Sequence, residues 1–302
     1  MKIIVSAKQI RHTYARTGTS PESHYIRPED HIYRVNPHDE AALELALGLK
    51  DKLENITVIL LTLGPMIAED EMRRCLAAGA DDLYQINVAG QPPSESNPST
   101  SDPLDQADPW VKSDLMARAV KELNADLVLC GKTSVDKGSG QVGALVAHRL
   151  DRPFVSAITD LSMDEAGGTV QVQRSAGRGV RELIECRLPA VFSVDLGTDL
   201  RMPTFTQRQW AEHYVPHQLD LTADVESPKI VCTHRFQPRP RPKIVPAPDS
   251  RLHAYERIMQ LLIGSTVEKS GEMLTGSPDA QVEGIIAFLQ ANGFLESDRA
   301  DP

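Results

Sequence analysis

The residues best suited to chemistry lie in one glycine-rich segment, residues 131–143, between a short apolar run and a helix-forming sequence. Small residues there let backbone N–H groups approach a bound anion closely. The start of the following helix adds a partial positive charge and unpaired N–H donors, which favour phosphate. The segment therefore predicts a nucleotide-phosphate site at residues 139–142. The alternative is a connection whose glycines only permit tight packing.

Part of this segment also matches Gly-x-Gly-x-x-Gly, from Gly138 to Gly143, and Asp160 follows about 20 residues later, as in dinucleotide-binding folds. In that motif the first glycine turns directly off the strand. Here seven residues separate Cys130 from Gly138, which is enough for a wider loop. We therefore discount the dinucleotide match. No Walker phosphate-loop pattern occurs in the chain.

Three other short segments are expected at the same place. Residues 6–8 and 62–64 end apolar runs that are typical of buried strands, and residues 36–39 open the next predicted helix. Ligands of doubly wound sheets bind outside the carboxyl ends of the parallel strands, so these segments would meet the glycine-rich one. The alternative is structural: Asn36 and Asp39 would cap the helix, and Lys8 would be a solvated lysine.

The remaining reactive side chains give weaker signals. His213 and His217 have metal-ligand spacing on a helix, but Pro216 would interrupt that helix, so we predict no metal site. Three arginines of a predicted hairpin would lie in solvent or face an acidic partner or a flavin phosphate: Arg174, Arg178 and Arg181. The four cysteines are far apart and form no Cys-x-x-Cys pair, so we expect reduced core residues: Cys75, Cys130, Cys186 and Cys232.

The elements that must position these residues alternate between apolar runs and helix-period segments. This alternation predicts an α/β fold, a doubly wound and mostly parallel sheet of the adenine-nucleotide-binding, Rossmann-like kind. Residues 169–173 and 180–187 flank a glycine-containing turn and predict an antiparallel β-hairpin. The predicted strands of the parallel sheet are residues 3–7, 56–62, 83–87, 127–130, 154–158 and 190–196, and the predicted helices are residues 40–53, 66–78, 110–123 and 142–150.

The predicted sheet occupies only the first part of the chain. Residues 1–200 form the expected nucleotide-binding α/β domain. Residues 201–250 are expected to be an extended proline-rich arm, because its prolines cannot continue a helix or donate ladder hydrogen bonds. Residues 251–302 form the expected C-terminal helical segment, whose two helices need a surface to pack against. Residues 90–109, rich in Pro, Ser and Asp, are expected to be a surface loop.

Charge and hydropathy narrow the function classes. The chain has 302 residues and a formal net charge of -10, from 42 acidic and 32 basic side chains, so we expect no nucleic-acid binding. No stretch approaches the roughly 18 apolar residues that cross a bilayer, and the N-terminus runs straight into a predicted strand. We therefore expect a cytoplasmic protein without direct membrane insertion.

Several short motifs, in one order along residues 1–200, resemble the beta subunits of electron-transfer flavoproteins. No single motif is specific, but their order is. The motifs are Val5-Ser6-Ala7-Lys8, Asn36-Pro37-His38-Asp39-Glu40-Ala41, Leu63-Gly64-Pro65, Ala77-Ala78-Gly79-Ala80-Asp81, Ala125-Asp126-Leu127-Val128-Leu129-Cys130-Gly131-Lys132 with Asp136, Gln141 and Gly143, and Leu188-Pro189-Ala190-Val191.

The resemblance implies an electron-carrier subunit in a heterodimer rather than an enzyme with catalytic side chains of its own. A larger alpha subunit would carry the redox-active FAD, and this chain would hold AMP or, in electron-bifurcating members, a second FAD. Electrons would pass from flavin dehydrogenases, such as those of acyl-CoA oxidation, to an acceptor such as a quinone reductase. Carried over by position, the nucleotide contacts are Ser6, Asn36, Pro37, His38, Asp39, Leu63, Gly131, Lys132, Thr133, Ser134, Val135, Asp136, Gly138, Ser139, Gly140, Gln141 and Val142.

Some positions depart from the usual family pattern. Gln141-Val142-Gly143 is more similar to the bifurcating members than to the ordinary ones. The loop that docks a dehydrogenase aligns with residues 203–211, where Arg208 falls near the usual leucine. Residues 247–269 resemble an insertion, as does the 90–109 loop. Two other functions stay open: a stand-alone adenine-nucleotide-binding regulator of the universal-stress type, and a nicotinamide-dependent dehydrogenase.

Overall fold

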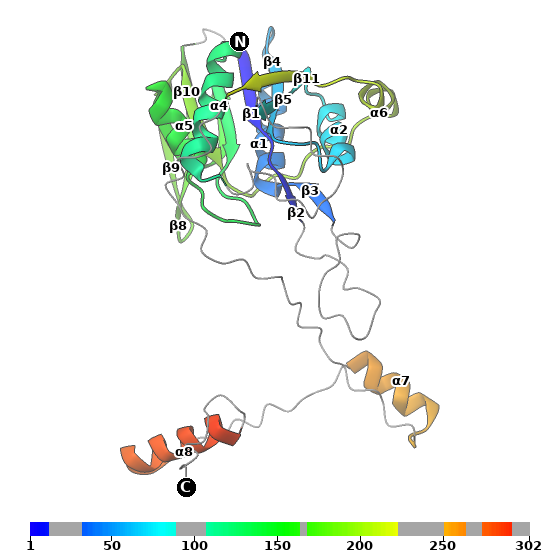
Figure 1. Cartoon of the computed structure of the whole chain (residues 1–302), viewed down its shortest axis with the longest axis vertical. Coiled ribbons are helices and arrows are strands. Elements are labelled where there is room, and N and C mark those ends of the chain that lie inside the picture. The colour runs from blue at the N-terminus through cyan, green and yellow to red at the C-terminus, as the bar shows by residue number, and fades with distance from the viewer. Residues whose placement is uncertain (12–31, 89–106, 164–167, 223–250, 264–273, 292–302) are drawn as a thin grey trace. The chain divides into compact units, whose positions relative to one another are not determined.

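The structure, a computed structural model, describes residues 1–11, 32–88, 107–163, 168–222, 251–263 and 274–291 (Figure 1). The chain divides into two units, residues 1–241 and 242–302. The second contains the helices α7 (Ala254–Ile263) and α8 (Pro278–Ala291). No helix in the described ranges is long and apolar enough to span a membrane.

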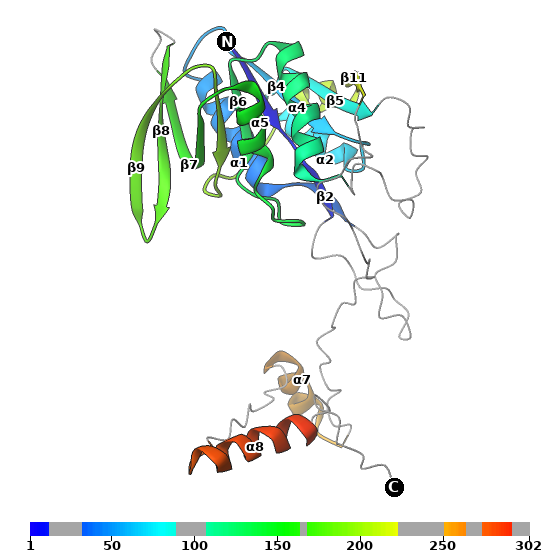
Figure 2. The ribbon, with the colours of Figure 1, turned by 60° about the vertical axis from the view of Figure 1, so that its left-hand side comes forward.

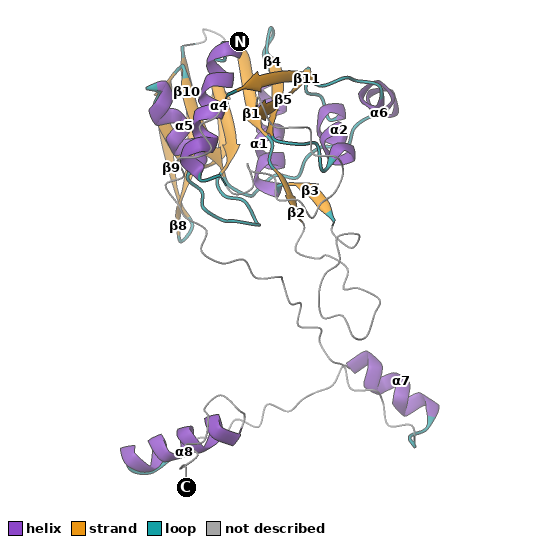
Figure 3. Cartoon of the chain, in the orientation of Figure 1, coloured by secondary structure: helices purple, strands orange, loops and turns teal. Residues whose placement is uncertain are grey.

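The first unit is built on a nine-stranded sheet with the order β11-β5-β4-β1-β6-β10-β7-β8-β9. The pairs from β11 to β7 are parallel, whereas β8 and β9 add an antiparallel hairpin to β7 (Figure 3). The strands are β1 (Lys2–Ser6), β4 (Thr57–Leu63), β5 (Asp82–Val88), β6 (Leu127–Gly131), β7 (Phe154–Met163), β8 (Thr169–Gly177), β9 (Val180–Arg187), β10 (Ala190–Val194) and β11 (His217–Leu221). A separate pair, β2 (Gln9–Arg11) and β3 (Tyr33–Val35), is antiparallel.

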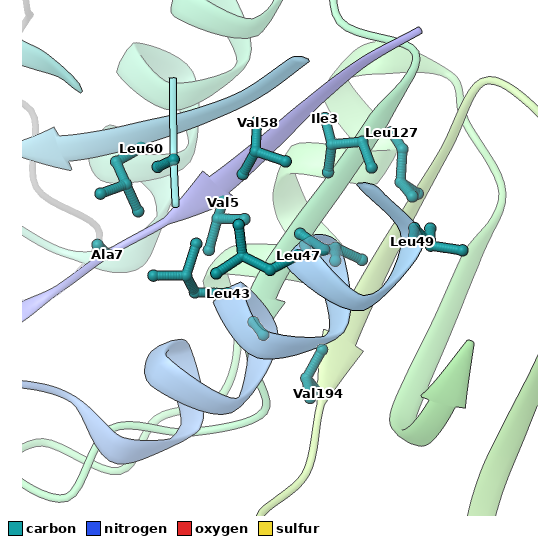
Figure 4. Close-up of a cluster of buried hydrophobic side chains, with 14 of the residues drawn as sticks. Ile3, Val5, Ala7, Leu43, Leu47, Leu49, Val58, Leu60, Leu127 and Val194 are labelled. Atoms are coloured by element: carbon teal, nitrogen blue, oxygen red, sulfur yellow. The ribbon is translucent and has the colours of Figure 1, made fainter. Parts of the chain in front are cut away.

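Helices cover both faces of the sheet (Figure 2). Successive strand residues point to opposite faces, so Ile3 and Val5 pack in one core and Ile4 in the other. The first core includes the leucines of α1 (Pro37–Lys50), such as Leu43 and Leu47, together with α2 (Glu69–Ala77) (Figure 4). The second includes α4 (Pro109–Leu123) and α5 (Val142–Leu150). The predicted doubly wound, mostly parallel fold is confirmed.

The direction of winding reverses between β1 and β6. From β1 the chain proceeds through β4 and β5 toward one edge of the sheet, and then returns through α4 to β6 on the other side of β1. Such a reversal leaves a crevice at the carboxyl ends of the two strands, where ligands of this fold class bind. Those ends are Ser6 and Gly131, paired through the register Ser6 to Cys130.

The predicted helix limits are shifted in places. Helix α1 begins at Pro37 with Asn36 as its N-cap residue, as the motif at residues 36–39 predicts, but it ends at Lys50 rather than at residue 53. Helix α2 begins at Glu69 rather than at residue 66. The hairpin is confirmed, but β8 extends to Gly177, so its turn is shorter than expected. Both turn glycines and Arg178 have positive φ angles of 51° to 83°.

The structure differs from the expected extended arm over the first part of residues 201–250. Residues 205–212 form helix α6 (Phe205–Glu212), which begins with a capping box between Thr204 and Gln207. Residues 217–221 form β11, parallel to β5. Of the prolines that favoured an arm, Pro203 precedes the cap and Pro216 precedes the strand, so neither interrupts these elements. Residues 223–250 lie outside the described residues, as do 89–106 of the expected surface loop.

Candidate functional site

The glycine-rich segment forms an open loop, residues 132–141, between β6 and α5. From Val135 to Gln141 it is exposed. The glycines at the two ends of the segment do permit tight packing, as the alternative supposed, since a Cβ atom at Gly143 would lie 2.5 Å from Cys130 Sγ. Gly138 and Gly140 have φ angles of 65° and 62°, a region that glycine adopts without strain. Within the described residues, the backbone N–H groups of residues 138–141 donate no hydrogen bond to the protein. The loop thus presents free donors at the switch point of the sheet.

The start of α5 adds to this anion-binding character. Its N-cap residue, Gln141, makes no side-chain capping bond, and no acidic residue lies in its first turn. The partial positive charge of the helix end is therefore not compensated by a side chain of the helix itself. A phosphate near residues 139–142 would gain about 0.3–1 kcal/mol from the helix dipole, in addition to its hydrogen bonds.

Asn36 is the N-cap residue of α1 and Asp39 lies in its first turn, as the structural alternative supposed, but the Asn36 side chain makes no capping hydrogen bond to the helix. The buried Asn36 side chain reaches into the loop, where it donates to the Thr133 carbonyl at 3.0 Å and accepts from the Val135 N–H at 3.3 Å. The Asp39 carboxylate accepts from the backbone N–H of Lys8 and from that of Gly131, each at 2.7 Å. These two side chains tie the start of α1 to the carboxyl ends of β1 and β6.

Gly131 allows this close approach. A Cβ atom at residue 131 would lie 2.2 Å from Asp39 Oδ1 and 2.7 Å from His38 Cβ, so only glycine fits. Burial raises the pKa of Asp39 to about 7, although hydrogen bonds from Lys8, Asn36 and Gly131 act in the opposite direction. The contact is therefore a closely packed, buried polar junction between the start of α1 and the end of β6.

Lys8 is not the solvated lysine that the alternative supposed. Its ammonium group donates to both carboxylate oxygens of Asp136, at 2.6 and 2.7 Å, and to Ser134 Oγ at 3.1 Å. Partial burial opposes ionisation of Asp136, but the hydrogen bonds from Lys8 and Ser134 outweigh it and lower the pKa of this carboxyl. Lys8 thus links β1 to the middle of the loop.

A second charged group lies beside the loop and was missed by sequence reasoning. Asp195 follows β10 and accepts from Lys132 Nζ at 2.8 Å. His38 Nδ1 lies 3.9 Å from Asp195 Oδ1, too far for a hydrogen bond, and is buried without a partner among the described residues. Burial lowers the pKa of His38. The predicted strand 190–196 ends at the same edge of the sheet, and that signal could have identified Asp195.

The other predicted contacts also lie at this edge. Ser6 ends β1 and Pro37 is the first residue of α1. Leu63 ends β4, separated from Gly131 by β1. The structure therefore brings the predicted residues to the carboxyl ends of three neighbouring strands, β4, β1 and β6. Their contact with a nucleotide stays a prediction.

The weaker candidates lie elsewhere. His213 caps the end of α6 and His217 begins β11, where it stacks on Tyr84 at 4.7 Å, so the two histidines do not share a helix. Among the described residues, no group of three or more His, Cys, Asp or Glu side chains could hold a metal. Cys232 lies outside the described residues, and the other three cysteines are buried free thiols. In the hairpin, Arg174 lies 3.6 Å from Glu182, Arg178 occupies the turn, and Arg181 donates to Thr159.

A separate surface hollow of about 660 Å³ lies beside α6, away from the carboxyl ends of β1 and β6. It is lined by Thr206, Gln209, Trp210, His213, Tyr214 and Val215. Tyr214 is anchored below it, because its hydroxyl donates to Asp82 Oδ1 at 3.0 Å. This hollow is open and is unrelated to the glycine-containing loop.

The fold and the site together define a class: a doubly wound α/β protein with an open, glycine-containing loop at the switch point of its sheet. Comparison with known proteins is more specific. A family profile described as "Electron transfer flavoprotein domain" matches residues 28–199. The chain is 27% identical to the electron transfer flavoprotein subunit beta of Bacillus subtilis over 276 residues, which cover 89% of this chain and 91% of the relative.

Two further relatives agree with this result. The chain is 32% identical to the caffeyl-CoA reductase-Etf complex subunit CarD of Acetobacterium woodii, over 64% of this chain and 68% of the relative. It is 34% identical to protein FixA of Azotobacter vinelandii, over 66% and 67% of the two chains. The chain therefore belongs to the electron transfer flavoprotein family, among its beta subunits, and the resemblance seen in the sequence motifs is confirmed.

Proposed function

We propose that this beta subunit holds an adenine nucleotide, AMP or a second FAD, at the carboxyl edge of β1 and β6, and pairs with an FAD-carrying alpha subunit. The observation that carries the proposal is the exposed 132–141 loop, whose N–H groups at residues 138–141 are unbonded within the described chain. Backbone donors beside a helix N-terminus favour phosphate, and AMP and FAD both contain it.

The residues present fit such a ligand. The loop supplies main-chain donors, and the buried, unpartnered Nδ1 of His38 supplies a polar atom close to Lys132 and Asp195. The glycines at 138 and 140 keep the backbone accessible. A bound flavin would supply the electron-transfer chemistry. The protein groups bind and orient the ligand, and none of them is needed as an acid, base or nucleophile.

Two exposed apolar surfaces support the proposed partners, each within its own unit. Helix α8 exposes Val282, Ile285, Ile286 and Phe288, which suits a helix that is covered in a complex with the alpha subunit. In the first unit, Met202 and Phe205 are 81% and 75% exposed beside the exposed Arg208. This is the region where a flavin dehydrogenase is expected to dock, before electrons pass to an acceptor such as a quinone reductase.

Co-expression of the full chain with an alpha subunit tests the proposal. We expect a yellow heterodimer, and we would quantify its FAD and AMP after denaturation. Two FAD per heterodimer would identify the bifurcating type, and one FAD with one AMP the ordinary carrier. A colourless complex, or no complex, would contradict the proposal. A homodimer that binds ATP without an alpha subunit would instead support the universal-stress-type regulator, and binding of NADH would support the dehydrogenase.

A further inference from the structure

Lys8 occupies a junction at the switch point. Its backbone is held on both sides, because its N–H donates to Asp39 Oδ2 at 2.7 Å and its carbonyl accepts from the Asn36 N–H at 2.9 Å. Its side chain crosses from the end of β1 to the loop after β6 and contacts Ser134 and Asp136. A rigid backbone therefore carries a long side chain directly to the loop.

The ion pair with Asp136 reaches further into the loop than the other anchors described above. Asp39 holds Gly131, and Asn36 holds Thr133 and Val135, all in the first half. Asp136 lies next to the segment that carries the unbonded N–H groups, residues 138–141. Loss of the ion pair would therefore loosen the loop beside the residues that present those donors.

The charge and the hydrogen bonds of Lys8 are already satisfied. An ammonium group has three N–H donors, and Lys8 has three acceptor atoms within 3.1 Å, two of them on one carboxylate. The pair is half-buried, with 36% and 23% of the two side chains exposed. A phosphate that approaches the loop would thus meet a neutral pair and not a free cation.

We propose that Lys8 is a positioning residue, which acts through Asp136 to hold the 132–141 loop in the shape that presents its backbone donors to a phosphate. This inference rests on the proposed function and deepens it, because it names a residue outside the loop, Lys8, that holds the loop in place. It also distinguishes Lys8 from a direct phosphate ligand.

The chain offers a matched control. Lys50 and Asp81 form another lysine–aspartate pair with the same 2.6 Å separation, and 30% and 38% of their side chains are exposed. That pair lies where α1 ends and β5 begins, at the opposite edge of the sheet. Lys50→Met makes the same substitution as Lys8→Met and removes the same charge, without touching the loop.

A first experiment needs no nucleotide. Amide hydrogen exchange of the ligand-free full chain should be faster over residues 132–137 in Lys8→Met than in the wild type, and unchanged there in Lys50→Met. These residues contain the hydrogen-bonded amides of the loop, those of Lys132, Val135 and Lys137. Lys8→Arg, which keeps the charge, should behave like the wild type. Equal exchange over the loop in wild type and Lys8→Met would overturn the proposal.

A second experiment distinguishes a positioning role of Lys8 from direct contact with the phosphate. The two roles predict opposite changes of AMP affinity in Asp136→Asn. If Lys8 acts through Asp136, Lys8→Met and Asp136→Asn should each weaken AMP binding about threefold to tenfold, and the double variant should be no weaker than either single variant. If Lys8 binds the phosphate itself, Asp136→Asn should tighten binding, because it removes a negative charge and frees the lysine. That tightening, or an additive double variant, would overturn the proposal.

The same titration distinguishes a failure of the role of Lys8 from a failure of the proposed function. Isothermal titration of the wild-type full chain with AMP, and separately with FAD, gives the reference, and Lys50→Met should match it. Binding by the wild type with no loss in Lys8→Met or Asp136→Asn would overturn the role of Lys8 alone. A wild type that binds neither probe would overturn the proposed function, and the role of Lys8 in nucleotide binding with it.

Discussion

At the scale of single residues, the site depends on polar side chains that cross between elements. Asn36 and Asp39 lie at the start of α1, yet the Asn36 side chain binds backbone groups of the loop after β6, and the Asp39 side chain binds the backbone N–H of Gly131 at the end of β6. Such bonds are worth most when both partners are buried, because an unpaired buried polar group costs about 1–3 kcal/mol. The site is therefore sensitive to small changes at the positions where these side chains converge.

Gly131→Ala should damage this junction. Its new methyl group would lie 2.2 Å from Asp39 Oδ1, so the start of α1 would have to move. Overpacking of this kind costs about 1–3 kcal/mol, and we expect urea denaturation to show that loss together with weaker AMP binding. Gly197→Ala is the control, because nothing lies within 4 Å of the Cβ position there. An unchanged free energy of unfolding for Gly131→Ala would contradict the close approach of α1 to the end of β6.

At the scale of elements, α6 is held by the helix beside it. Arg73 of α2 donates to the carbonyls of Ala211 and Tyr214, at 2.6 and 3.0 Å, and so satisfies acceptors at and just beyond the end of α6. The capping box at Thr204 holds the other end. The exposed residues of α6 are thus presented on a helix that is capped at its start and bound to α2 at its end.

Arg73→Met should loosen this helix. We expect faster amide exchange over residues 205–215, with a local loss of about 1.5–3 kcal/mol, because two hydrogen bonds to a charged donor disappear. Arg74→Met is the matched control on the same helix, since Arg74 pairs with Glu40 and Glu71 instead. AMP binding should be unaffected in both variants. Exchange over α6 that is equal in Arg73→Met and the wild type would show that Arg73 does not anchor it.

At the scale of the whole molecule, both hydrophobic cores are formed within the first unit. Their buried residues run from Ile3 to Leu219, on the two faces of one sheet. The described residues of the second unit, within 251–263 and 274–291, contribute none of the buried residues of these clusters. Burial of apolar surface is the main stabilising contribution in folding, so the first unit contains what it needs to fold.

A chain that ends at Arg241, where the first unit ends, should therefore fold. We expect the same thermal unfolding midpoint for the sheet as in the full chain, and the same affinity for AMP. Its complex with the alpha subunit should be weaker, because α8 and its exposed apolar residues are lost. Circular dichroism and titration would check the first two points. A truncated chain that does not unfold cooperatively would show that residues 242–302 are needed for the sheet.

The sequence alone determined the class of fold and the family, and it predicted the place of the site. Apolar runs and helix-period segments follow local periodicities, so the order of strands and helices can be predicted from the sequence. Motifs such as Asn36-Pro37-His38-Asp39 are also local, so they indicate the family without a structure. The loop at 131–143 was predictable in the same way, because glycine spacing is a local property of the chain.

Only the tertiary structure decided what the side chains at the site do. Lys8 and Asp136 are far apart in the chain, and no local pattern marks them as a pair, yet the parallel pairing of β1 with β6 brings them together. The expected arm was likewise wrong at residues 205–212, because a capping box and the anchor from Arg73 stabilise a helix there. Local sequence sets periodicity and capping, whereas charge pairing between distant strands depends on the sheet that aligns them.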